Sequence, residues 1–291
     1  MTKVIKIEAA DWNGPRTRQL QEEAHYALEA GNVLLFPQLR FRLAETETHF
    51  LSPTTAGKSK NVSLNITNGE LRGSNYEPTE MEPLKNMMAR FAQHSKDFLL
   101  QLLPRYELGL IQARTSFRPM EIAGRSTSWR KDDTRLHVDS FPSSPVQDKR
   151  ILRIFSNVNP QGQSRSWRLG ESFEKVAARF LPSLSRPIFG SSQLLRLCQI
   201  TKSRRSAYDH LMLQLHDCMK ADLNYQSQAD QIAYDFPPGS TWIVFTDQVS
   251  HAAMAGRYAL EQTFYLPVTS MMDESKSPLR TLERLTQRKL I

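Results

Sequence analysis

The N-terminal part of the chain alternates a helical pattern with a short apolar run. Residues 16–30 place their apolar side chains on one helical face and end at Gly31, which predicts a first helix. The run VLLF at 33–36 follows and stops at Pro37, which predicts a buried strand. Residues 40–75 are polar and show little periodicity, so we expect a long surface loop there.

A long amphipathic helix is predicted next. Thr79 and Glu82 have the spacing of a capping box, in which each side chain bonds the backbone N–H of the other residue. The apolar face that follows consists of Leu84, Met88, Phe91, Phe98 and Leu102. Pro104 ends the helix, and residues 108–118 have the pattern of a strand.

The middle of the chain predicts a strand at 150–158 and two helical stretches, at 170–181 and at about 190–222. The inward faces of these two stretches are Phe173, Val176, Ala177 and Phe180, then Tyr208, Leu211, Met212, Leu215 and Met219. His210 and His216 are six residues apart and do not share a helical face, so we expect them to bind no common metal ion.

The late part of the chain turns to sheet. Strands are predicted at 232–236, 241–245 and 258–266, and the sequence PPG at 237–239 joins the first two by a tight turn. Residues 270–291 are charged and weakly periodic, which indicates a loose terminal helix.

Helices that come first and strands that come later, joined by tight turns, favour an α+β fold. We expect an antiparallel jelly roll, or double-stranded β-helix, with flanking helices. We expect a single domain over residues 1–291. Its jelly-roll core would span about 105–268, between an N-terminal helical and loop flank at 1–104 and a C-terminal tail at 269–291.

Composition places the chain among folded soluble proteins. It has 291 residues, of which 40% are hydrophobic. The longest apolar run is too short to cross a bilayer, and residues 1–14 lack the apolar core of a signal peptide. Cys198 and Cys218 fall in separate parts of the predicted helical stretch, so we expect two buried thiols, no disulfide and a cytoplasmic location.

The formal net charge of +8 favours an anionic partner. Nucleic acid, an acidic membrane surface and an acidic small molecule all satisfy this charge, and its sign does not choose among them.

Candidate chemistry appears in the extended segment 134–141. His137 and Asp139 are two residues apart, so on a strand they point to the same side. An imidazole and a carboxylate placed in this way are two ligands for a divalent transition metal, although a histidine that is simply hydrogen-bonded in a loop or core fits the same residues. His251 lies in a predicted strand–turn–strand unit and is the candidate third ligand. Two histidines and one carboxylate form the facial triad of non-haem Fe(II) oxygenases.

Several separate blocks of the sequence resemble the Kdo hydroxylase family, within the Fe(II)/2-oxoglutarate-dependent dioxygenases. The blocks are SWRKDDTRLHVD at 128–139, KNVS at 60–63, TSFRP at 115–119, RIFSNVNP at 153–160 and TDQVSH at 246–251. They occur in the family's order and extend the similarity over about residues 30–268.

The resemblance implies a reaction and its cofactors. The enzyme would hydroxylate C3 of 3-deoxy-D-manno-oct-2-ulosonic acid (Kdo) on lipid A to give Ko. It would use Fe(II), 2-oxoglutarate and dioxygen, and would release succinate and carbon dioxide. His137, Asp139 and His251 would hold the iron.

The anchor for the 2-oxoglutarate 5-carboxylate departs from the pattern of these oxygenases. A basic residue is expected about ten positions beyond the distal histidine, where this chain has Glu261 and Gln262. The nearest basic residue is Arg257, which we predict as the anchor, with Arg135 or Arg130 as substitutes.

Kdo carries a carboxylate and lipid A carries phosphates, so the basic residues near the predicted site are candidate substrate contacts. We expect substrate contacts from Lys58, Lys60, Asn61, Arg125, Arg130 and Lys131. We also expect peripheral attachment at the cytoplasmic face of the inner membrane, through charge.

Two other classes of function remain open from the residues alone. A zinc metallohydrolase would use the same three ligands, but neither ligand block offers a clear glutamate as general base. A nucleic-acid-binding module would use the positive charge with exposed aromatic side chains, whereas Trp167, Phe173 and Phe180 have the pattern of core residues.

Overall fold

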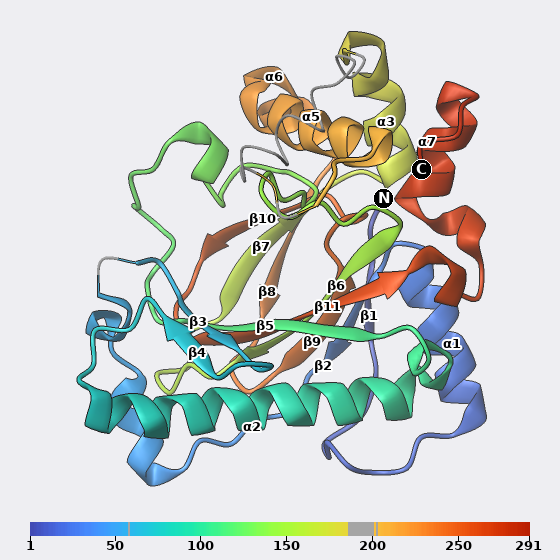
Figure 1. Ribbon diagram of the computed structural model, residues 1–291. Helices are drawn as coiled ribbons and strands as arrows, with labels where there is room; N and C mark the ends of the chain where they lie inside the picture. The colour runs from blue at the N-terminus through green and yellow to red at the C-terminus, as the bar shows by residue number, and fades with distance from the viewer. Residues whose placement is uncertain (58, 186–200, 202) are drawn as a thin grey trace.

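The computed structural model describes residues 1–57, 59–185, 201 and 203–291, whose strands form two facing sheets (Figure 1). In spatial order, the larger sheet contains β1 (Val4–Lys6), β2 (Val33–Phe36), β9 (Thr241–Phe245), β6 (Lys149–Asn157), β11 (Ala259–Pro267), β5 (Ile111–Arg118), β3 (Val62–Asn65) and β4 (Glu70–Arg72). The smaller sheet contains β10 (His251–Ala255), β7 (Arg165–Leu169) and β8 (Ile232–Phe236). Among these strands β1 and β2 pair in parallel, and the other pairs are antiparallel, as in the expected jelly roll.

Helices cover the larger sheet and one end of the sandwich. α1 (Arg18–Glu29) and α2 (Pro78–Leu102) pack on the face of the larger sheet that points away from the smaller one (Figure 1). α3 (Phe173–Phe180), α5 (Ala207–Ala221) and α6 (Leu223–Gln228) gather at one end, and α7 (Pro278–Thr286) packs beside α3. Within the described residues, no helix is both long enough and apolar enough to cross a membrane.

Strand alternation divides the buried side chains of the larger sheet between two cores. Phe36 of β2 meets Phe98 of α2 with ring centroids 5.0 Å apart, whereas its neighbour Leu35 faces the smaller sheet. In this second core the ring of Trp242 on β9 stacks on that of Phe236 on β8 at 4.2 Å. Both faces of the larger sheet are therefore covered, which explains why β2 is apolar at every position.

The periodic segments fold as expected. The helix predicted at 16–30 and the strand predicted at 33–36 are confirmed as α1 and β2. Every residue of the predicted apolar faces of α2 and α3 is buried. The stretch predicted at about 190–222 contains α5, on which Cys218 is a free and partly buried thiol. Cys198 and the beginning of that stretch lie outside the described residues.

The predicted capping box is wrong. α2 begins at Pro78 with Glu77 as its N-cap residue, and no side chain caps it, so Thr79 lies inside the first turn. Proline suits the first helical position because it has no N–H to leave unbonded and its φ is already helical.

Residues 40–75 are more ordered than the long loop we expected. Two 3-10 helices, Glu45–Phe50 and Pro53–Ala56, precede a hairpin made of β3 and β4. The hairpin closes at Gly69, which has a φ of 68° and follows Asn68. Asn-Gly is a recognised hairpin signal. Since β1 to β4 all join the larger sheet, the sheet extends beyond the core predicted at about 105–268.

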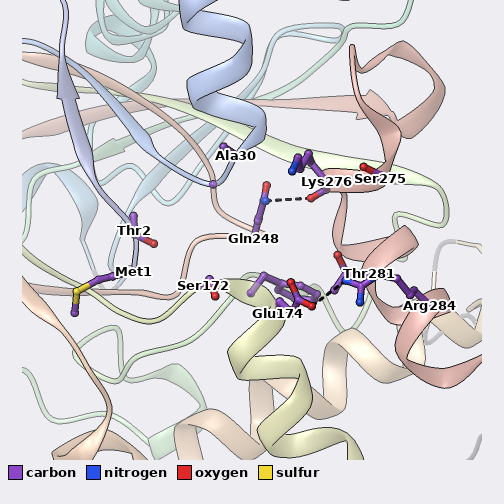
Figure 2. A pocket seen from close by; sticks show the side chains of 12 residues that line it. Met1, Thr2, Ala30, Ser172, Glu174, Gln248, Ser275, Lys276, Thr281 and Arg284 are labelled. Atoms are coloured by element: carbon purple, nitrogen blue, oxygen red, sulfur yellow. Dashed lines mark hydrogen bonds and ion pairs between the residues drawn. The ribbon is translucent and has the colours of Figure 1, made fainter.

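The terminal helix predicted within 270–291 is confirmed as α7, but it is packed firmly and not loosely as we expected. Leu279 and Leu282 of α7 are fully buried. Gln248, in the loop between β9 and β10, donates through Nε2 to the carbonyls of Lys276 and Glu29, both at 3.1 Å. Figure 2 shows Gln248 and Lys276 at a pocket of about 330 Å³ between the N-terminus, the end of α1 and α7. The C-terminal segment thus supports the loop that leads to His251.

Candidate metal centre

The segment that carries His137 lies along the edge of β10 that β7 leaves free. His137 and His251 exchange two backbone hydrogen bonds, in which the N–H of each donates to the carbonyl of the other at 3.0 and 2.9 Å. The Asp139 N–H donates to the Thr246 carbonyl at 2.8 Å. Two parts of the chain that are far apart in sequence are thereby fixed side by side.

One amide side chain holds the other side of this segment. Gln226 of α6 accepts the Leu136 N–H through Oε1 at 2.7 Å and donates through Nε2 to the Leu136 carbonyl at 3.0 Å. Nε2 also lies within hydrogen-bond distance of the Met219 carbonyl, at 2.8 Å. Because Leu136 directly precedes His137, the histidine backbone is held from both sides.

The three predicted metal ligands come together. His137, Asp139 and His251 each offer a ligand atom, these atoms lie within 4.8 Å of one another, and all three residues are buried. His137 Nε2 is 3.7 Å from Asp139 Oδ1. Two imidazoles and one carboxylate that converge in this way have the donor set of a facial triad.

The hydrogen bonds of the two histidines leave Nε2 of each ring available to bind a metal ion. Nδ1 of His137 lies 2.7 Å from the Arg135 carbonyl, and Nδ1 of His251 lies 2.8 Å from the Val249 carbonyl. A carbonyl only accepts, so each Nδ1 carries the proton. Each neutral ring therefore keeps a lone pair on Nε2, and the carbonyls fix the ring orientation as outer partners of metal-bound histidines do.

The electrostatic surroundings keep all three groups ready for a cation. Burial, followed by the neighbouring His251, holds the pKa of His137 well below its usual value, and burial also lowers the pKa of His251. Burial opposes ionisation of Asp139, but the positive charge of Arg153 and the smaller effects of the neighbouring groups together outweigh it, and they hold the pKa of this carboxyl well below its usual range. The imidazoles are thus neutral and the carboxylate is ionised near neutral pH.

A chain of alternating charges runs from the ligands into the space between the sheets. Arg153 Nη2 lies 2.9 Å from Asp139 Oδ2, close enough for an ion pair though not aligned as a hydrogen bond. Arg153 Nη1 lies 3.1 Å from Glu261 Oε1, and Arg118 Nε donates to Glu261 Oε2 at 2.7 Å. Glu261 is the acid found where the oxygenase pattern has a basic residue. Its carboxylate pairs with two arginines from other strands.

A further arginine in this space has no carboxylate partner among the residues that the structure describes. Arg165 shares the inward face of β7 with Trp167, whose ring stacks on that of His251 at 5.2 Å. Arg165 is buried, its Nη1 donates to the Gly256 carbonyl at 3.0 Å, and its Nε has no partner in the described part of the chain. Burial, and then the charge of Arg118, lower the pKa of Arg165 to about 9. A buried guanidinium in this state is suited to receive an anion.

The residues predicted to bind 2-oxoglutarate make other contacts. Arg257 Nη2 donates to Gln161 Oε1 at 2.8 Å, and its guanidinium lies over the Tyr258 ring. Arg135 Nη1 donates to the carbonyl of Lys220 at 2.8 Å, so Arg135 joins the ligand segment to α5.

The predicted substrate contacts differ in the partners that they have among the described residues. Lys60 Nζ donates to both carboxylate oxygens of Asp133, at 2.8 and 2.7 Å. Arg125 Nη1 is 3.8 Å from the same carboxylate. Arg130 Nε donates to Asp217 at 3.0 Å. Asn61 is half-buried and Lys131 is exposed, while Lys58 lies outside the described residues.

Sequence reasoning missed several residues that surround the ligands. They are Arg118, Arg153, Arg165, His216, Lys220 and Gln226. The first two stand inside the blocks TSFRP and RIFSNVNP, so the resemblance itself contained a signal for them. The others carry no local motif, because their place at the site comes from the packing of α5, α6 and β7.

A jelly roll that brings two histidines and one carboxylate together near one end defines the class of the non-haem metal-dependent oxygenases. Within that class, the chain belongs to the 3-deoxy-D-manno-oct-2-ulosonic acid (Kdo) hydroxylase family, whose sequence profile matches residues 11–289. No curated protein sequence matches the chain significantly.

Solved structures agree with this family. A Kdo hydroxylase, KdoO, described as a non-haem Fe(II) alpha-ketoglutarate-dependent dioxygenase, has been solved with cobalt(II). It is 49% identical, the match covers 99% of this chain and 97% of that one, and the TM-score is 0.97. The structure with alpha-ketoglutarate and Fe(III) is 49% identical, with 100% and 98% coverage and a TM-score of 0.96. The structure with succinate and Fe(III) is also 49% identical, with 99% and 97% coverage and a TM-score of 0.95.

Replacing Arg153 tests how the carboxylate ligand is held. We expect Arg153→Met to weaken cobalt(II) binding by roughly 10- to 100-fold, because Asp139 loses the charge that orients it and keeps it ionised. Titration with cobalt(II), followed by visible absorption, measures this affinity. Arg284→Met, at an exposed ion pair on α7, is the matched control and should change nothing.

Unchanged or tighter cobalt binding in Arg153→Met would contradict this role, because it would mean that the arginine only competes with the metal. Circular dichroism should show that the variant is folded. Arg153→Lys, which keeps the charge but not the fork that reaches two carboxylates, should lie between the other two proteins.

Proposed function

We propose that this protein, a member of the Kdo hydroxylase family of Fe(II)/2-oxoglutarate-dependent dioxygenases, hydroxylates C3 of Kdo on lipid A to give Ko, with succinate and carbon dioxide as co-products. The observation that carries the proposal is the buried set of His137, Asp139 and His251 in a member of the Kdo hydroxylase family. The lipid A context, the position of hydroxylation and the product come from the resemblance of the sequence blocks.

The residues present fit an iron ion. Both histidines keep Nε2 free, Asp139 is ionised, and the three ligands leave the rest of a metal's coordination sphere for reactants. Bound iron, with 2-oxoglutarate as the reductant, would supply the activation of dioxygen for insertion into a C–H bond. The chain's own part is to fix the ligands, exclude water from the space between the sheets, and orient two acidic reactants.

The hydroxylase reading is favoured over the hydrolase that shares these ligands. Of the carboxylates near the triad, Glu261 is tied to Arg118 and Arg153, and Asp133 is tied to Lys60. Neither is free to act as the general base that a zinc hydrolase needs.

Arg165 is our revised candidate for the anchor of the 2-oxoglutarate 5-carboxylate. It is buried between the sheets on the face of β7 that also carries Trp167, and it has no acidic partner within the described residues. Arg257, predicted from its position in the sequence, is bonded to Gln161. Both arginines donate to a neutral acceptor, but Arg165 is buried and Arg257 lies near the surface, so Arg165 gains more from a carboxylate because water does not already solvate its charge.

These two candidates are separated by one comparison. We expect Arg165→Met to raise the KM for 2-oxoglutarate by roughly 10- to 100-fold, since a charge-assisted hydrogen bond is worth about 1.5–3 kcal/mol. Arg257→Met should leave this KM within about twofold. Succinate formation against 2-oxoglutarate concentration gives both values, and the reverse pattern would return the anchor to Arg257.

A turnover assay tests the reaction itself. Purified protein with Fe(II) and 2-oxoglutarate in air should add one oxygen atom to the Kdo unit of Kdo-bearing lipid A, with one succinate per product, as measured by mass spectrometry. The gain should disappear in His137→Ala and without 2-oxoglutarate. Succinate without a mass gain would retain the dioxygenase and reject the substrate, and zinc-dependent hydrolysis in its place would reject both.

We also propose that the protein works at the cytoplasmic face of the inner membrane as a peripheral protein. The net charge of +8 and the exposed Lys131, near the ligand segment in sequence, support this location. It should sediment with vesicles that contain phosphatidylglycerol at low salt and be released at about 0.5 M salt, where screening shortens the reach of charge. Equal binding to uncharged vesicles, or none at low salt, would argue against charge-driven attachment.

A further inference from the structure

One face of α5 lies against the metal ligands. His216 and Lys220 are one helical turn apart and therefore share a face. The ring of His216 meets that of His137 edge-on, with centroids 5.4 Å apart. Lys220 Nζ donates to the Arg130 carbonyl at 2.9 Å, and the Lys220 carbonyl accepts from Arg135 Nη1 at 2.8 Å. This helix therefore forms a wall beside the segment that carries His137 and Asp139.

Lys220 is a buried cation that, among the described residues, has no carboxylate in direct contact, although the charges of Asp133 and Asp139 act on it from further away. Only 2% of the residue is exposed, and among the described residues no carboxylate lies within 4.0 Å of its ammonium group. The residues outside the description contain no aspartate or glutamate in their sequence, so they cannot supply one either. The ammonium has three N–H groups, and the Arg130 carbonyl accounts for one of them. Lys60 differs, because Asp133 neutralises it.

A buried ammonium group destabilises the folded protein unless an anion binds to it. Removing an ammonium group from water without a counter-charge carries a free-energy penalty that an ion pair would offset. Burial lowers the pKa of Lys220. Lys220 lies one helical turn from His216, whose ring meets that of His137, so the ammonium belongs to the wall beside the metal ligands.

The described residues thus contain two buried cations that lack a carboxylate partner, Arg165 on β7 and Lys220 on α5. The proposed reaction has two acidic reactants, 2-oxoglutarate and a sugar acid. Arg165 lies between the sheets and is assigned above to 2-oxoglutarate. Lys220 lies on α5, one of the helices that gather at one end of the sandwich (Figure 1).

We propose that Lys220 binds the carboxylate of the sugar acid and thereby positions the sugar beside the metal. This assignment rests on the proposed function. It makes Lys220 a substrate-binding residue and gives the site a means to select an acidic sugar over a neutral one, because a neutral sugar would leave the ammonium unpaired.

The test removes either side of the pair. Wild type and Lys220→Met, whose side chain is of similar length, are assayed with Kdo-bearing lipid A and with the same lipid whose Kdo carboxylate is a methyl ester. We expect kcat/KM to fall by roughly 10- to 100-fold when either partner is removed, and to fall little further when both are. Lys175→Met, at an exposed lysine on α3, is the control and should behave as wild type.

Other measurements separate this role from its rivals. Cobalt(II) affinity and the KM for 2-oxoglutarate should be unchanged in Lys220→Met, and a raised KM for 2-oxoglutarate would overturn the assignment in favour of the cosubstrate. Equal loss on acid and ester would reduce Lys220 to a structural residue and would also overturn it.

Binding without turnover keeps the inference separate from the reaction. Free Kdo and its methyl ester are titrated calorimetrically into the cobalt(II) protein and into its Lys220→Met variant. Weaker binding of the acid in the variant would support Lys220 even if the lipid were not hydroxylated, which would reject only the proposed function. Equal binding of acid and ester to the wild type would reject the role of Lys220.

Discussion

The pair of backbone hydrogen bonds between His137 and His251 is the constraint on which the site depends. It joins a segment outside the named strands to β10, and it sets the two imidazoles on the same side of the backbone ladder. The remaining supports act on this pair. Gln226 holds the outer edge through Leu136, and Gln248 ties the loop before His251 to the C-terminal segment. Backbone pairing thus sets the positions of the metal ligands, and hydrogen bonds from the side chains of Gln226 and Gln248 stabilise these positions.

The space between the sheets combines apolar and charged material in separate zones. Aromatic rings fill the zone beneath β9 and β8, while Asp139, Arg153 and Glu261 form alternating charges beside it. Each paired charge satisfies its neighbour, so burial is tolerated. Among the described residues, Arg165 and Lys220 are the buried cations without a carboxylate in contact, and we assign them to the two acidic reactants. Part of the chain's net positive charge is therefore buried at the site, where it can bind acidic reactants, and is not only on the surface.

Two kinds of sequence signal gave correct predictions: the periodic spacing of apolar residues and the ordered set of motif blocks. Periodicity located α1 and the buried face of α2, and the motif blocks identified the three ligands. Periodicity missed β7, because Arg165 on its inward face reads as a solvent-facing residue. Lys220 was missed for the same reason, since a sequence shows that a residue is charged but not whether it is buried or paired. The partners of Glu261 depend on the register of β5, β6 and β11, which pairwise packing decides.

Alternation along these strands separates two kinds of selection. On β5, β6 and β11, Phe117, Ile154 and Leu260 point to the helices, whereas their neighbours Arg118, Arg153 and Glu261 point into the space between the sheets. Neighbouring residues of one strand are therefore under different constraints: one is constrained by packing against the helices and the next by the chemistry of the site. Substitutions at every second residue of these strands would change the side chains between the sheets and leave the layer packed on the helices intact. Sequence change at the inward positions would therefore report on substrate chemistry, and sequence change at the outward positions would report on the packing of the scaffold.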